Sequence, residues 1–466
     1  MSRSAAISIV QKLRQSDHQA YLVGGCVRDL VMGREPADYD VATDATPDQV
    51  MGLFPRSYGV GAQFGVVLVP VDGSATESGA PQSRGRDATS YVSTAAALKT
   101  PTIEIATFRS DVGYSDGRHP DQVRYTKDPK EDVQRRDFTI NGLLYDPIED
   151  RVLDYVGGLA DIRRGVIQTI GDPHQRFRED KLRMLRAVRF AARLGYEIDA
   201  ATFAAIRDLA AEIHQVSCER IRDELSKILT EGHARRAFEL LDQTGLLQEV
   251  LPEVSAMKGV EQPPQFHPEG DVWVHTLLLL EKLPQPCAKT LAWGALLHDV
   301  GKPPTFRVAP DRIRFDEHVS VGTRMAEDIC RRLRFSNDET EQISALVANH
   351  MRFADVLRMK ESTIKRFLRL HRFDEHLELH RLDCLSSHGD LTFYEFMKQK
   401  LAATPETQIL PRPLLSGHDL MAAGYKPGPH FKEILAAVED AQLEGHLHTR
   451  EEALEFVQSR FPAAVT

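Results

Sequence analysis

The sequence predicts an α+β fold, in which a head of mixed strands and helices precedes a long, all-helical body. Short apolar segments with strand character lie before about residue 150. Beyond about residue 175, apolar side chains recur at helical spacing instead, and no repeat of fixed length runs through the chain. The 466 residues are enough for two to four domains, at roughly 100–200 residues for each.

The head contains four predicted strands and one clear helix start. Thr46 and Pro47 are typical of a helix start, because threonine caps the first backbone N–H groups and proline fits the first turn. Residues 72–100 are rich in Gly, Ser, Ala and Thr and have no stable period, so we expect a mobile insertion there. The predicted strands are residues 21–25, 39–42, 64–71 and 102–108.

The body is predicted to be helical, with two proline-rich breaks at 258–271 and 403–415. Helices of its first part are expected at 178–194, 200–214, 218–230 and 232–243, and further helices follow from residue 271 onward. The chain is therefore divided into four predicted domains. They are a head at 1–150, a hinge and helical neck at 151–257, a helical domain at 258–402 and a C-terminal helical segment at 403–466.

Composition excludes several classes of protein. Hydrophobic residues make up 42% and charged residues 27% of the chain, as in ordinary globular proteins. No uncharged apolar run approaches the ~18 residues of a membrane span, and the N-terminus lacks the apolar core of a secretory signal. The five cysteines are dispersed and include no CxxC pair, which is typical of reduced thiols. We therefore expect a cytoplasmic protein with no membrane partner, and the sequence indicates no particular oligomeric state.

One basic segment contrasts with the net charge of −10. From Gln175 to Arg193 the chain has seven lysines and arginines but only two acidic residues. Contacts with nucleic-acid phosphates need such cations, whereas a solvated helix face is the alternative.

The first stretch with chemical meaning is residues 22–43. Gly24 and Gly25 end a strand and open a helix, so the backbone can approach a triphosphate closely, and Arg28 follows one turn later. Asp38 and Asp40 are two apart on a strand and face one side, where a pair of Mg²⁺ ions would stabilise the repelling carboxylates. Two such ions can activate an attacking hydroxyl and stabilise a leaving pyrophosphate. The alternative is an exposed pair of aspartates in a turn.

A third carboxylate and a second stretch extend this pattern. Glu104, in the strand at 102–108, could join the two aspartates as a catalytic carboxylate, or it could be a surface glutamate. Arg136, Asp137 and Asn141 combine a cation, an acceptor and an amide, which suit phosphate and ribose hydroxyl groups.

The basic segment forms the third stretch. On a continuous helix, its charged residues at every third position would form a slowly drifting stripe along one face, opposite an apolar face. An arginine beside a carboxylate offers donors and acceptors at the spacing of a base's Watson–Crick edge. The alternative is a ladder of ion pairs along the helix. The residues of the stripe are Asp180, Arg183, Arg186 and Arg189.

The three stretches, in this order, closely resemble the class II nucleotidyltransferases of the polymerase β superfamily, namely tRNA CCA-adding enzymes and bacterial poly(A) polymerases. The stretch with Asp38 and Asp40 resembles their motif A, and motifs B, C and D are matched by residues 135–146, 154–173 and 179–194. The resemblance implies a polymerase β-like head that holds Mg²⁺ on Asp38 and Asp40. It also implies that the triphosphate is contacted by Gly25, Arg28 and Arg136.

The same resemblance implies how the nucleotide is chosen and where the chain bends. Asp180 and Arg183 would pair with the incoming CTP or ATP, with Arg186 and Arg189 beside them. Residues 115–120 resemble the flexible loop needed for A addition, and the insertion at 72–100 departs from the family pattern. A hinge between head and neck would contain Gly157, Gly158 and Asp161.

A second constellation lies in the helical body. His267 and His275 are expected before a helix, and the adjacent pair His298-Asp299 follows an apolar helix. A buried histidine–aspartate pair needs a partner, and a metal ion is a good one. Imidazole and carboxylate ligands together suit a transition metal such as Mn²⁺, Ni²⁺, Co²⁺, Fe²⁺ or Zn²⁺.

This constellation resembles the HD phosphohydrolase superfamily. His275, His298, Asp299 and Asp383 match its signature, and His318 and His350 would be the additional ligands of its two-metal members. The resemblance implies an HD domain at 258–402 with phosphatase and 2′,3′-cyclic phosphodiesterase activity. A structural remnant without activity is the alternative.

The last segment, residues 414–454, resembles the C-terminal tRNA-handling segment of many bacterial members. Ser416 is expected to cap a helix that Gly424 ends. A helical packing element is the alternative.

These observations lead to one main hypothesis and several rivals. The main hypothesis is a tRNA nucleotidyltransferase that builds the 3′-terminal CCA without a nucleic-acid template, with an HD hydrolase domain downstream. Its partners would be the tRNA 3′ end, CTP and ATP. A poly(A) polymerase, a CC-only enzyme and an A-only enzyme use the same motifs and stay open. A rival of another class is an HD hydrolase whose head only binds nucleotide, against which the intact Asp38 and Asp40 argue.

Overall fold

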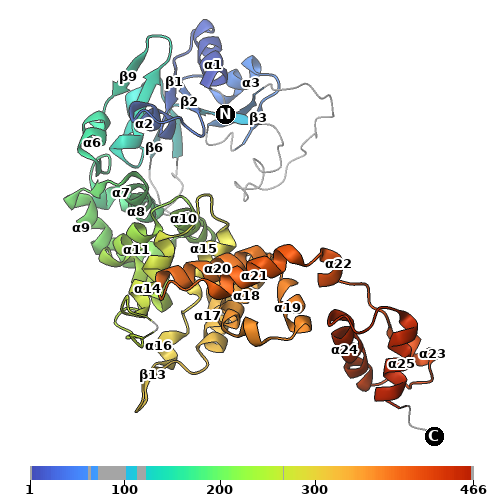
Figure 1. The fold of residues 1–466 in the computed structure, drawn as a ribbon. Helices are drawn as coiled ribbons and strands as arrows, with labels where there is room; N and C mark the ends of the chain where they lie inside the picture. Colours follow the sequence, from blue (N-terminus) through green and yellow to red (C-terminus); the bar gives the residue numbers. More distant parts are fainter. Residues whose placement is uncertain (1–2, 61–64, 72–100, 113–121, 266, 463–466) are drawn as a thin grey trace. The chain divides into compact units, whose positions relative to one another are not determined.

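The computed structural model describes residues 3–60, 65–71, 101–112, 122–265 and 267–462 (Figure 1). The predicted insertion at 72–100 and the predicted loop at 115–120 lie outside the described residues. The chain forms two compact units, of which the first comprises residues 1–228 with 236–250 and the second 229–235 with 251–466. The predicted division into four domains is finer than this and stays a prediction.

The first unit is built on a mixed seven-stranded sheet. In chain order its strands are β1 (Ala20–Val23), β2 (Asp40–Thr43), β3 (Tyr58–Gly59), β4 (Val66–Pro70), β5 (Thr102–Thr107), β8 (Leu143–Asp146) and β9 (Arg151–Asp154). Their spatial order is β3-β4-β5-β2-β1-β8-β9, and neighbours are antiparallel except for the parallel pair β2 and β5. The four predicted strands are confirmed as β1, β2, β4 and β5, whereas β3, β8 and β9 lie outside the prediction.

Two helices, α1 (Arg3–Gln15) and α3 (Pro47–Leu53), pack on the sheet (Figure 1). Thr46 caps α3 through a capping box with Gln49, and Pro47 takes the first helical position, as predicted. Fully burying each large apolar side chain contributes about 1.5–3 kcal/mol, so this packing holds the strands that carry the site residues. The side chains that α1 buries follow helical spacing and are Ala6, Ile9, Val10 and Leu13.

The remaining elements of the head lie between or after the strands of the sheet along the chain. They are α2 (Gly25–Val31), the hairpin of β6 (Arg109–Val112) and β7 (Gln122–Tyr125), α5 (Pro129–Gln134), the 3₁₀ turn η2 (Thr139–Asn141) and α6 (Gly158–Arg164). Gly24 has a φ of +78° between β1 and α2, a conformation that favours glycine. A Cβ atom on Gly158 would lie 2.2 Å from the carbonyl oxygen of Thr139, so this glycine permits the close packing of α6 on η2.

The neck differs from the prediction at its first long helix. Its helices are α7 (Pro173–Glu179), α8 (Leu182–Leu194), α9 (Ala200–Leu209), η3 (Ala210–Gln215), α10 (Cys218–Thr230), α11 (Ala234–Gln243) and α12 (Leu246–Val250). The predicted helix at 178–194 is interrupted, because Asp180 has an extended backbone with φ −148° and ψ 104°. Strands do not end at residue 175 as expected, since the short β10 (Val166–Ile167) and β11 (Glu197–Ile198) pair in parallel.

Among its described residues, the second unit is helical apart from the short hairpin of β12 (Arg307–Val308) and β13 (Ile313–Arg314). The helices around the histidines are α14 (Val272–Glu281), α15 (Lys289–Leu297), α16 (Lys302–Thr305), α17 (His318–Arg332), α18 (Asn337–Asn349), η4 (His350–Arg358) and α20 (Phe373–Ser386). The others are α13 (Pro252–Ser255), α19 (Glu361–Leu368), α21 (Thr392–Ala403), α22 (Glu406–Ile409), α23 (Gly417–Ala422), α24 (His430–Leu443) and α25 (Arg450–Arg460).

The C-terminal segment has a small apolar core of its own. Ser416 caps α23 through a capping box, and Gly424 follows the end of this helix with a φ of +90°, as predicted. Glu439 on α24 lies 2.8 Å from Arg366 Nη2 and 2.6 Å from Arg369 Nη1, so ion pairs connect the segment to α19. Core residues of the segment include Leu420, Tyr425, Ile434 and Val438.

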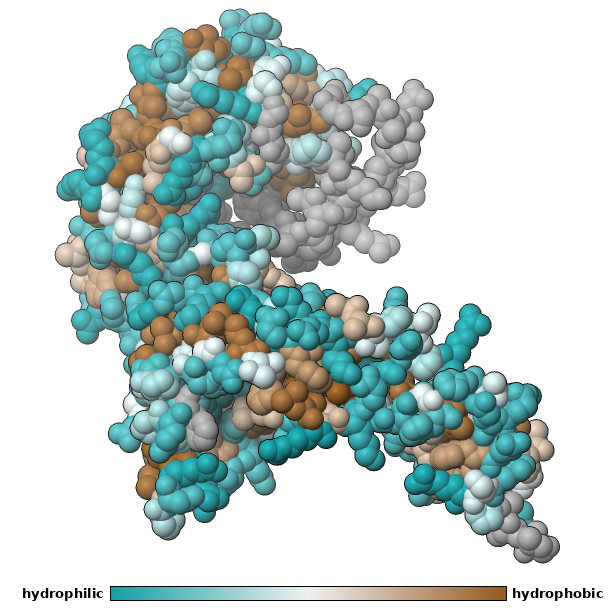
Figure 2. Space-filling model, in the orientation of Figure 1, coloured by the Kyte–Doolittle hydropathy of each residue, from teal (hydrophilic) through white to brown (hydrophobic). Residues whose placement is uncertain are grey.

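The surface of the chain is largely hydrophilic on the face that Figure 2 shows, with separate hydrophobic patches between the hydrophilic residues. Within the described ranges, none of the helices has the length and apolar composition that crossing a membrane requires. All five cysteines are free thiols, as the sequence predicts.

Candidate active site and histidine–aspartate cluster

The three predicted carboxylates of the head lie on or beside adjoining strands. Asp40 begins β2 and pairs in register with Glu104 on the parallel strand β5, and Asp38 precedes β2 by two residues. Loss of solvent raises the pKa of Asp40 to about 7, and the charges of Glu104 and Asp38 add to this against the attraction of Arg136. The pKa of Glu104 is raised by the same loss of solvent. Buried carboxylates that repel one another are stabilised in their ionised form by a nearby cation.

Two cavities meet at these carboxylates. The larger has a volume of about 690 Å³, within the range of sites that bind nucleotide-sized ligands. The smaller, of about 240 Å³, is lined by Glu104 and shares Asp40, Arg135 and Arg136 with the larger. Predicted residues that line the larger cavity are Gly24, Gly25, Arg28, Asp38, Asp40, Arg136, Asp137, Asn141, Asp180, Arg183, Arg186 and Arg189.

One wall of the larger cavity is a buried chain of polar contacts. Arg28 Nη1 donates to Asn141 Oδ1 at 2.9 Å, and Asn141 Nδ2 donates to Asp137 Oδ1 at 3.2 Å. Arg186 Nε and Nη2 donate to Asp137 Oδ2 at 2.9 and 2.6 Å. Burial alone would raise the pKa of Asp137, but the charge and hydrogen bonds of Arg186 lower it to about 2. These contacts join α2, η2 and α8, so four of the predicted residues hold one another in place.

Arg136 lies where the two cavities meet. Its Nη2 is 2.9 Å from Asp132 Oδ2, and its Nη1 would be 3.5 Å from a Cβ atom on Gly24. The guanidinium is therefore oriented by Asp132 beside the glycine turn, where a triphosphate would bring its negative charge.

Asp180 and Arg183 both line the larger cavity but come from two different elements. Asp180 lies in the break between α7 and α8, and its Oδ2 accepts a hydrogen bond from Arg220 Nη2 at 2.8 Å. Arg183, in the first turn of α8, donates from Nη1 to Glu179 Oε2 at 2.9 Å and from Nη2 to the Arg135 carbonyl at 3.2 Å. The expected continuous stripe is therefore wrong, because the backbone at Asp180 leaves the helical conformation.

Arg189 has a buried partner. Its Nε donates to Glu224 Oε1 on α10 at 2.6 Å, and the two side chains are 7% and 3% exposed. The guanidinium also lies 4.4 Å from the ring centre of Phe190. Although Arg189 lines the cavity, most of it serves the packing of α8 on α10.

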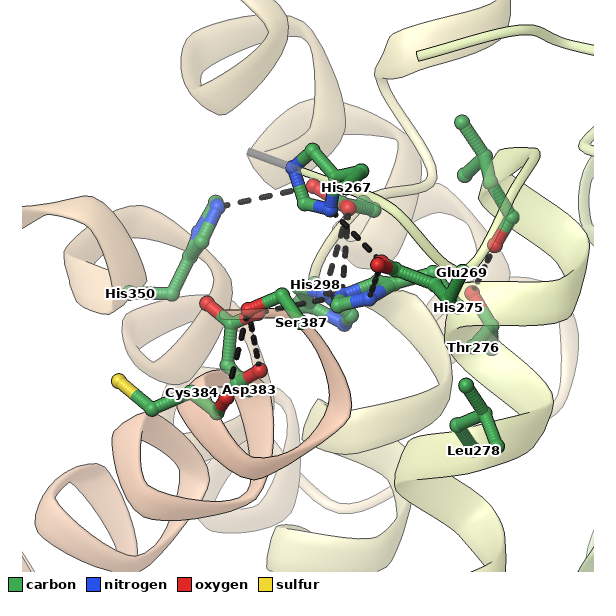
Figure 3. Close-up of polar contacts among 12 residues, drawn as sticks. His267, Glu269, His275, Thr276, Leu278, His298, His350, Asp383, Cys384 and Ser387 are labelled. Carbon is green, nitrogen blue, oxygen red and sulfur yellow. Dashed lines mark hydrogen bonds and ion pairs between the residues drawn. The ribbon is translucent and has the colours of Figure 1, made fainter. Parts of the chain in front are cut away.

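The second unit brings together the histidines and aspartates that the sequence singles out. His275, His298, His350 and Asp383 point toward one another from separate parts of the chain (Figure 3). His275 Nε2 lies 3.1 Å from Asp383 Oδ1 and 3.3 Å from His298 Nε2, and His298 Nε2 lies 3.3 Å from Asp299 Oδ2. We call these residues, with His318, the histidine–aspartate cluster. His275 lies inside α14 and not before it, because the side chain of Asp271 caps the helix at that point.

His318 and His350 present unpartnered nitrogens to the cluster. Nδ1 of His318 donates to the carbonyl of Phe315 at 2.8 Å, and Nδ1 of His350 donates to that of Val347 at 2.7 Å. Since a carbonyl only accepts, Nε2 is the nitrogen that faces the cluster, and in both residues it is buried without a hydrogen-bond partner among the described atoms. Burial lowers the pKa of His318, and it lowers that of His350 to about 4, so both rings are neutral at pH 7.

Asp299 lies between the two groups of histidines. Its Oδ2 faces His298, and its Oδ1 is 3.7 Å from His350 Nε2. Burial would raise the pKa of Asp299, but Lys302 and His298 lower it well below the usual range. Lys302 Nζ lies 2.7 Å from Asp299 Oδ2 and donates to Gln262 Oε1 at 2.6 Å.

Glu269 supports the cluster from outside. Its Oε1 accepts from His275 Nδ1 at 2.7 Å and from His267 Nδ1 at 2.8 Å (Figure 3). A carboxylate at Nδ1 fixes the tautomer that presents Nε2 to the cluster, which is the usual arrangement behind a metal-binding histidine. His267 is therefore placed beside the cluster through Glu269.

Two glycines let the cluster form. A Cβ atom on Gly301 would lie 2.1 Å from the carbonyl oxygen of His318 and 2.6 Å from the amide nitrogen of Gly322. The backbone that follows His298-Asp299 can therefore touch the first turns of α17, which brings His318 to Asp299.

A cavity of about 520 Å³ lies beside the cluster. Its polar side is formed by Lys302, His318 and Asp383, and Arg312 and Arg314 of the hairpin add positive charge. Apolar side chains also line the cavity, namely Ile313, Phe315, Met351, Ala354 and Phe393.

Comparison with known proteins places these sites in a family. Residues 20–90 and 78–168 match the profile described as "Poly A polymerase head domain". Residues 195–258 match "Probable RNA and SrmB- binding site of polymerase A", and residues 317–457 match a tRNA nucleotidyltransferase domain 2. The CCA-adding enzyme of Bacillus pumilus is 32% identical over 451 residues, which cover 97% of this chain and 95% of the relative. This chain belongs to the CCA-adding enzyme family.

Solved structures of CCA-adding enzymes have the same fold. The crystal structure of the Bacillus stearothermophilus enzyme in complex with CTP matches with a TM-score of 0.70 and 26% identity over 99% of this chain and 98% of that one. The Thermotoga maritima enzyme complexed with tRNA matches in fold with a TM-score of 0.56 at 19% identity, over 98% and 94% of the two chains. The predicted fold class and nucleotidyltransferase class are thereby confirmed.

Several cavity residues of this CCA-adding family member are missed by motif reasoning. Arg220 and Lys227, both on α10, line the larger cavity, and Asp132 orients Arg136. The sequence could have indicated Arg220 and Lys227, because they are seven residues apart on a predicted helix and therefore share one face. In the second unit, Glu269 and Lys302 are missed, although both lie within six residues of a predicted ligand.

Proposed function

We propose that this chain adds the 3′-terminal CCA to tRNA, using CTP and ATP, by two-metal nucleotidyl transfer without a nucleic-acid template. The observation that carries the proposal is the in-register pair of Asp40 and Glu104, with Asp38 beside it, at the meeting of two cavities. The relatives support it, since one is described as a CTP complex and another as a tRNA complex.

The carboxylates fit Mg²⁺, because a hard cation prefers carboxylate oxygens. Burial and the neighbouring carboxylates raise the pKa of Asp40, and a bound cation would offset both effects. When bound, Mg²⁺ supplies activation of the primer hydroxyl and charge stabilisation of the leaving pyrophosphate. The chain's own residues bind and orient. Gly24 and Gly25 let the backbone approach the triphosphate, and Arg28 and Arg136 offset its negative charge.

Base selection falls to Asp180 and Arg183. Cytosine and adenine both present an amino group beside a ring nitrogen, so a carboxylate that accepts and a guanidinium that donates can read either base. Uracil and guanine present a carbonyl where the amino group would be, and they would face the carboxylate with a second acceptor. This pattern selects C and A together against U and G, which suits CCA addition.

The test is direct sequencing of the products. Transcripts of tRNA that end at the discriminator base, at C or at CC are incubated with CTP, ATP or both, and the 3′ ends are sequenced. Completion of CCA from all three is expected. Homopolymer A would identify a poly(A) polymerase, and failure to pass one step would identify a CC-only or an A-only enzyme. Asp40→Asn should abolish addition while the thermal unfolding midpoint stays close to wild type, and undiminished turnover in this variant would overturn the metal assignment.

We also propose that the histidine–aspartate cluster is a metal-dependent phosphohydrolase site of the HD type. The observation that favours it is the pair of buried, unpartnered Nε2 atoms of His318 and His350. Imidazole and carboxylate ligands together suit a transition metal. The residues that would bind it are His275, His298, Asp299, Asp383, His318 and His350. Asp299 faces both groups of histidines, which fits a site with two metals.

The neighbouring cavity supports phosphate esters of an organic group as the substrate class. Lys302 and Arg312 provide cations, and Phe315, Phe393 and Met351 provide apolar wall. In a 2′,3′-cyclic phosphate or a 2′-phosphate of a nucleoside, the phosphate would contact the cations and the base would contact the apolar wall.

The test of the second site uses a matched pair of variants. His298→Ala with Asp299→Ala should remove bound transition metal and phosphodiesterase activity, and leave CCA addition near wild type. His371→Ala with Asp338→Ala is the control, because these two form an ion pair that is 66% and 62% exposed. If no metal co-purifies with wild type and none of Mn²⁺, Ni²⁺ or Co²⁺ supports hydrolysis, the cluster is a structural remnant. If hydrolysis is present and addition absent, the chain is an HD hydrolase with a nucleotide-binding head.

A further inference from the structure

Asp180 depends on one side chain from another part of the neck. It lies in the break between α7 and α8, so no helix fixes its orientation. Its Oδ1 accepts from the amide of Leu182 at 3.1 Å, and its Oδ2 accepts from Arg220 Nη2 at 2.8 Å. The side chains of Asp180 and Arg220 are 18% and 23% exposed, so the contact is partly shielded from water.

Arg220 reaches this contact from α10, forty positions further along the chain. Both residues line the larger cavity, so the contact lies inside the site itself. A carboxylate oxygen accepts more than one hydrogen bond, which lets Asp180 keep Arg220 and accept from a base amino group as well. Without Arg220, the carboxylate would retain its bond to the Leu182 amide and could turn about it.

Arg183 has a separate support. Its guanidinium is held by Glu179 Oε2 at 2.9 Å and by the carbonyl of Arg135 at 3.2 Å. Loss of Arg220 therefore leaves the contacts of Arg183 with Glu179 and Arg135 in place, and it acts on Asp180, the hydrogen-bond acceptor of the pair that reads the base.

We propose that Arg220 is a positioning residue that holds the Asp180 carboxylate toward the incoming base and so sets the preference for bases with an amino group. The inference rests on the proposed base-reading function of Asp180. Arg220 would not contact the reacting atoms, so its loss should act on the choice of nucleotide more than on the transfer step.

The experiment measures kcat and KM for each of the four nucleotides on a tRNA transcript that ends at CC or at the discriminator base. Arg220→Ala should lower the ratio of kcat/KM for CTP over UTP, and for ATP over GTP, by about tenfold, within the range that one base contact provides. Most of the loss should be a higher KM for CTP and ATP, with kcat close to wild type. Arg220→Lys should restore part of the selectivity, because it keeps the charge with a single point of contact.

Lys227→Ala is the matched control. Lys227 is on the same helix and lines the same cavity, and its removal takes away the same charge. It should raise KM for all four nucleotides by a similar factor and leave their ratios unchanged. If Lys227→Ala and Arg220→Ala change the ratios alike, Arg220 acts only through general charge and the inference is wrong.

Two further variants separate failure of the inference from failure of the proposed function. If Asp180→Ala loses selectivity and Arg220→Ala keeps it, only the inference falls. If Asp180→Ala also keeps full selectivity, the base-reading function itself falls. The double variant should be no less selective than Asp180→Ala alone, since the two act through one carboxylate. Thermal unfolding of each variant shows whether a loss of selectivity comes from misfolding. If Arg220→Ala does not fold, Arg220→Lys is compared with wild type instead.

Discussion

The buried pair of Arg189 and Glu224 allows stability and nucleotide binding to be tested in one set of variants. Their contact is 2.6 Å long and almost fully shielded, so removing one partner takes this short contact away from a buried charge. Arg189→Met or Glu224→Leu alone should therefore cost about 3–5 kcal/mol of stability. For a unit of this size that corresponds to a thermal unfolding midpoint lower by roughly 6–20 °C. The double change Arg189→Met with Glu224→Leu should recover most of the loss, because no isolated charge remains.

The double variant also decides between two functions for Arg189. The sequence suggested contact with the nucleotide, whereas the structure commits the side chain to Glu224. If the structural function is the main one, the double variant should add CCA with nearly wild-type KM for CTP and ATP. Unfolding is followed by circular dichroism and addition by product sequencing on the same preparations. A double variant that is as stable as wild type but has lost nucleotide affinity would refute this reasoning.

Three further outcomes follow from single contacts. Because the pKa of Asp137 is lowered to about 2, its ionised form stabilises the fold at pH values above about 4, and this contribution is lost as pH falls toward 2; the midpoint difference between wild type and Asp137→Asn should shrink over that interval. Glu269→Gln should weaken metal binding at the cluster by about 10–100-fold in calorimetric titration with Ni²⁺ or Mn²⁺, since the charge behind His275 is lost; unchanged affinity would show that the carboxylate is not needed. Gly301→Ala should destabilise the protein by several kcal/mol because its Cβ atom meets backbone at 2.1 Å, whereas Gly52→Ala, with open space around it, should be neutral or stabilising by about 0.5–1 kcal/mol in urea unfolding.

Local patterns were sufficient for much of the head. The capping signal at Thr46 and the apolar strands around Asp40 and Glu104 are set by nearby residues, and the structure has them where predicted. The prediction did not extend to β8 and β9, because β8 becomes a strand through pairing with β1, and β9 through pairing with β8. Such pairing depends on long-range contacts that periodicity does not report.

Tertiary contacts explain what the sequence missed at the sites. The break at Asp180 overrides a strong helical period, and it is accompanied by the contact with Arg220 forty positions later. Glu269 acts through hydrogen bonds to two histidines, and an isolated glutamate in a proline-rich segment carries no pattern that would mark it. Within the cluster, the adjacent pair His298-Asp299 is chemically unusual in an apolar segment, and the other members follow from the resemblance to the HD signature. The supporting residues are ordinary polar side chains that neither signal marks.

The antiparallel pairing of β4 with β5 fixes the position of Glu104, whatever number of residues joins the two strands. It is extended by a hydrogen bond from the Val71 amide to the Pro101 carbonyl at 2.8 Å, three positions before Glu104. These bonds hold Val71 beside Pro101, so the alignment of the two strands does not depend on how many residues separate them in the chain. In polymer terms, doubling the length of a flexible closed loop costs only about 0.6 kcal/mol of closure entropy. A family member can therefore carry a long insertion here while the two facing carboxylates keep their register.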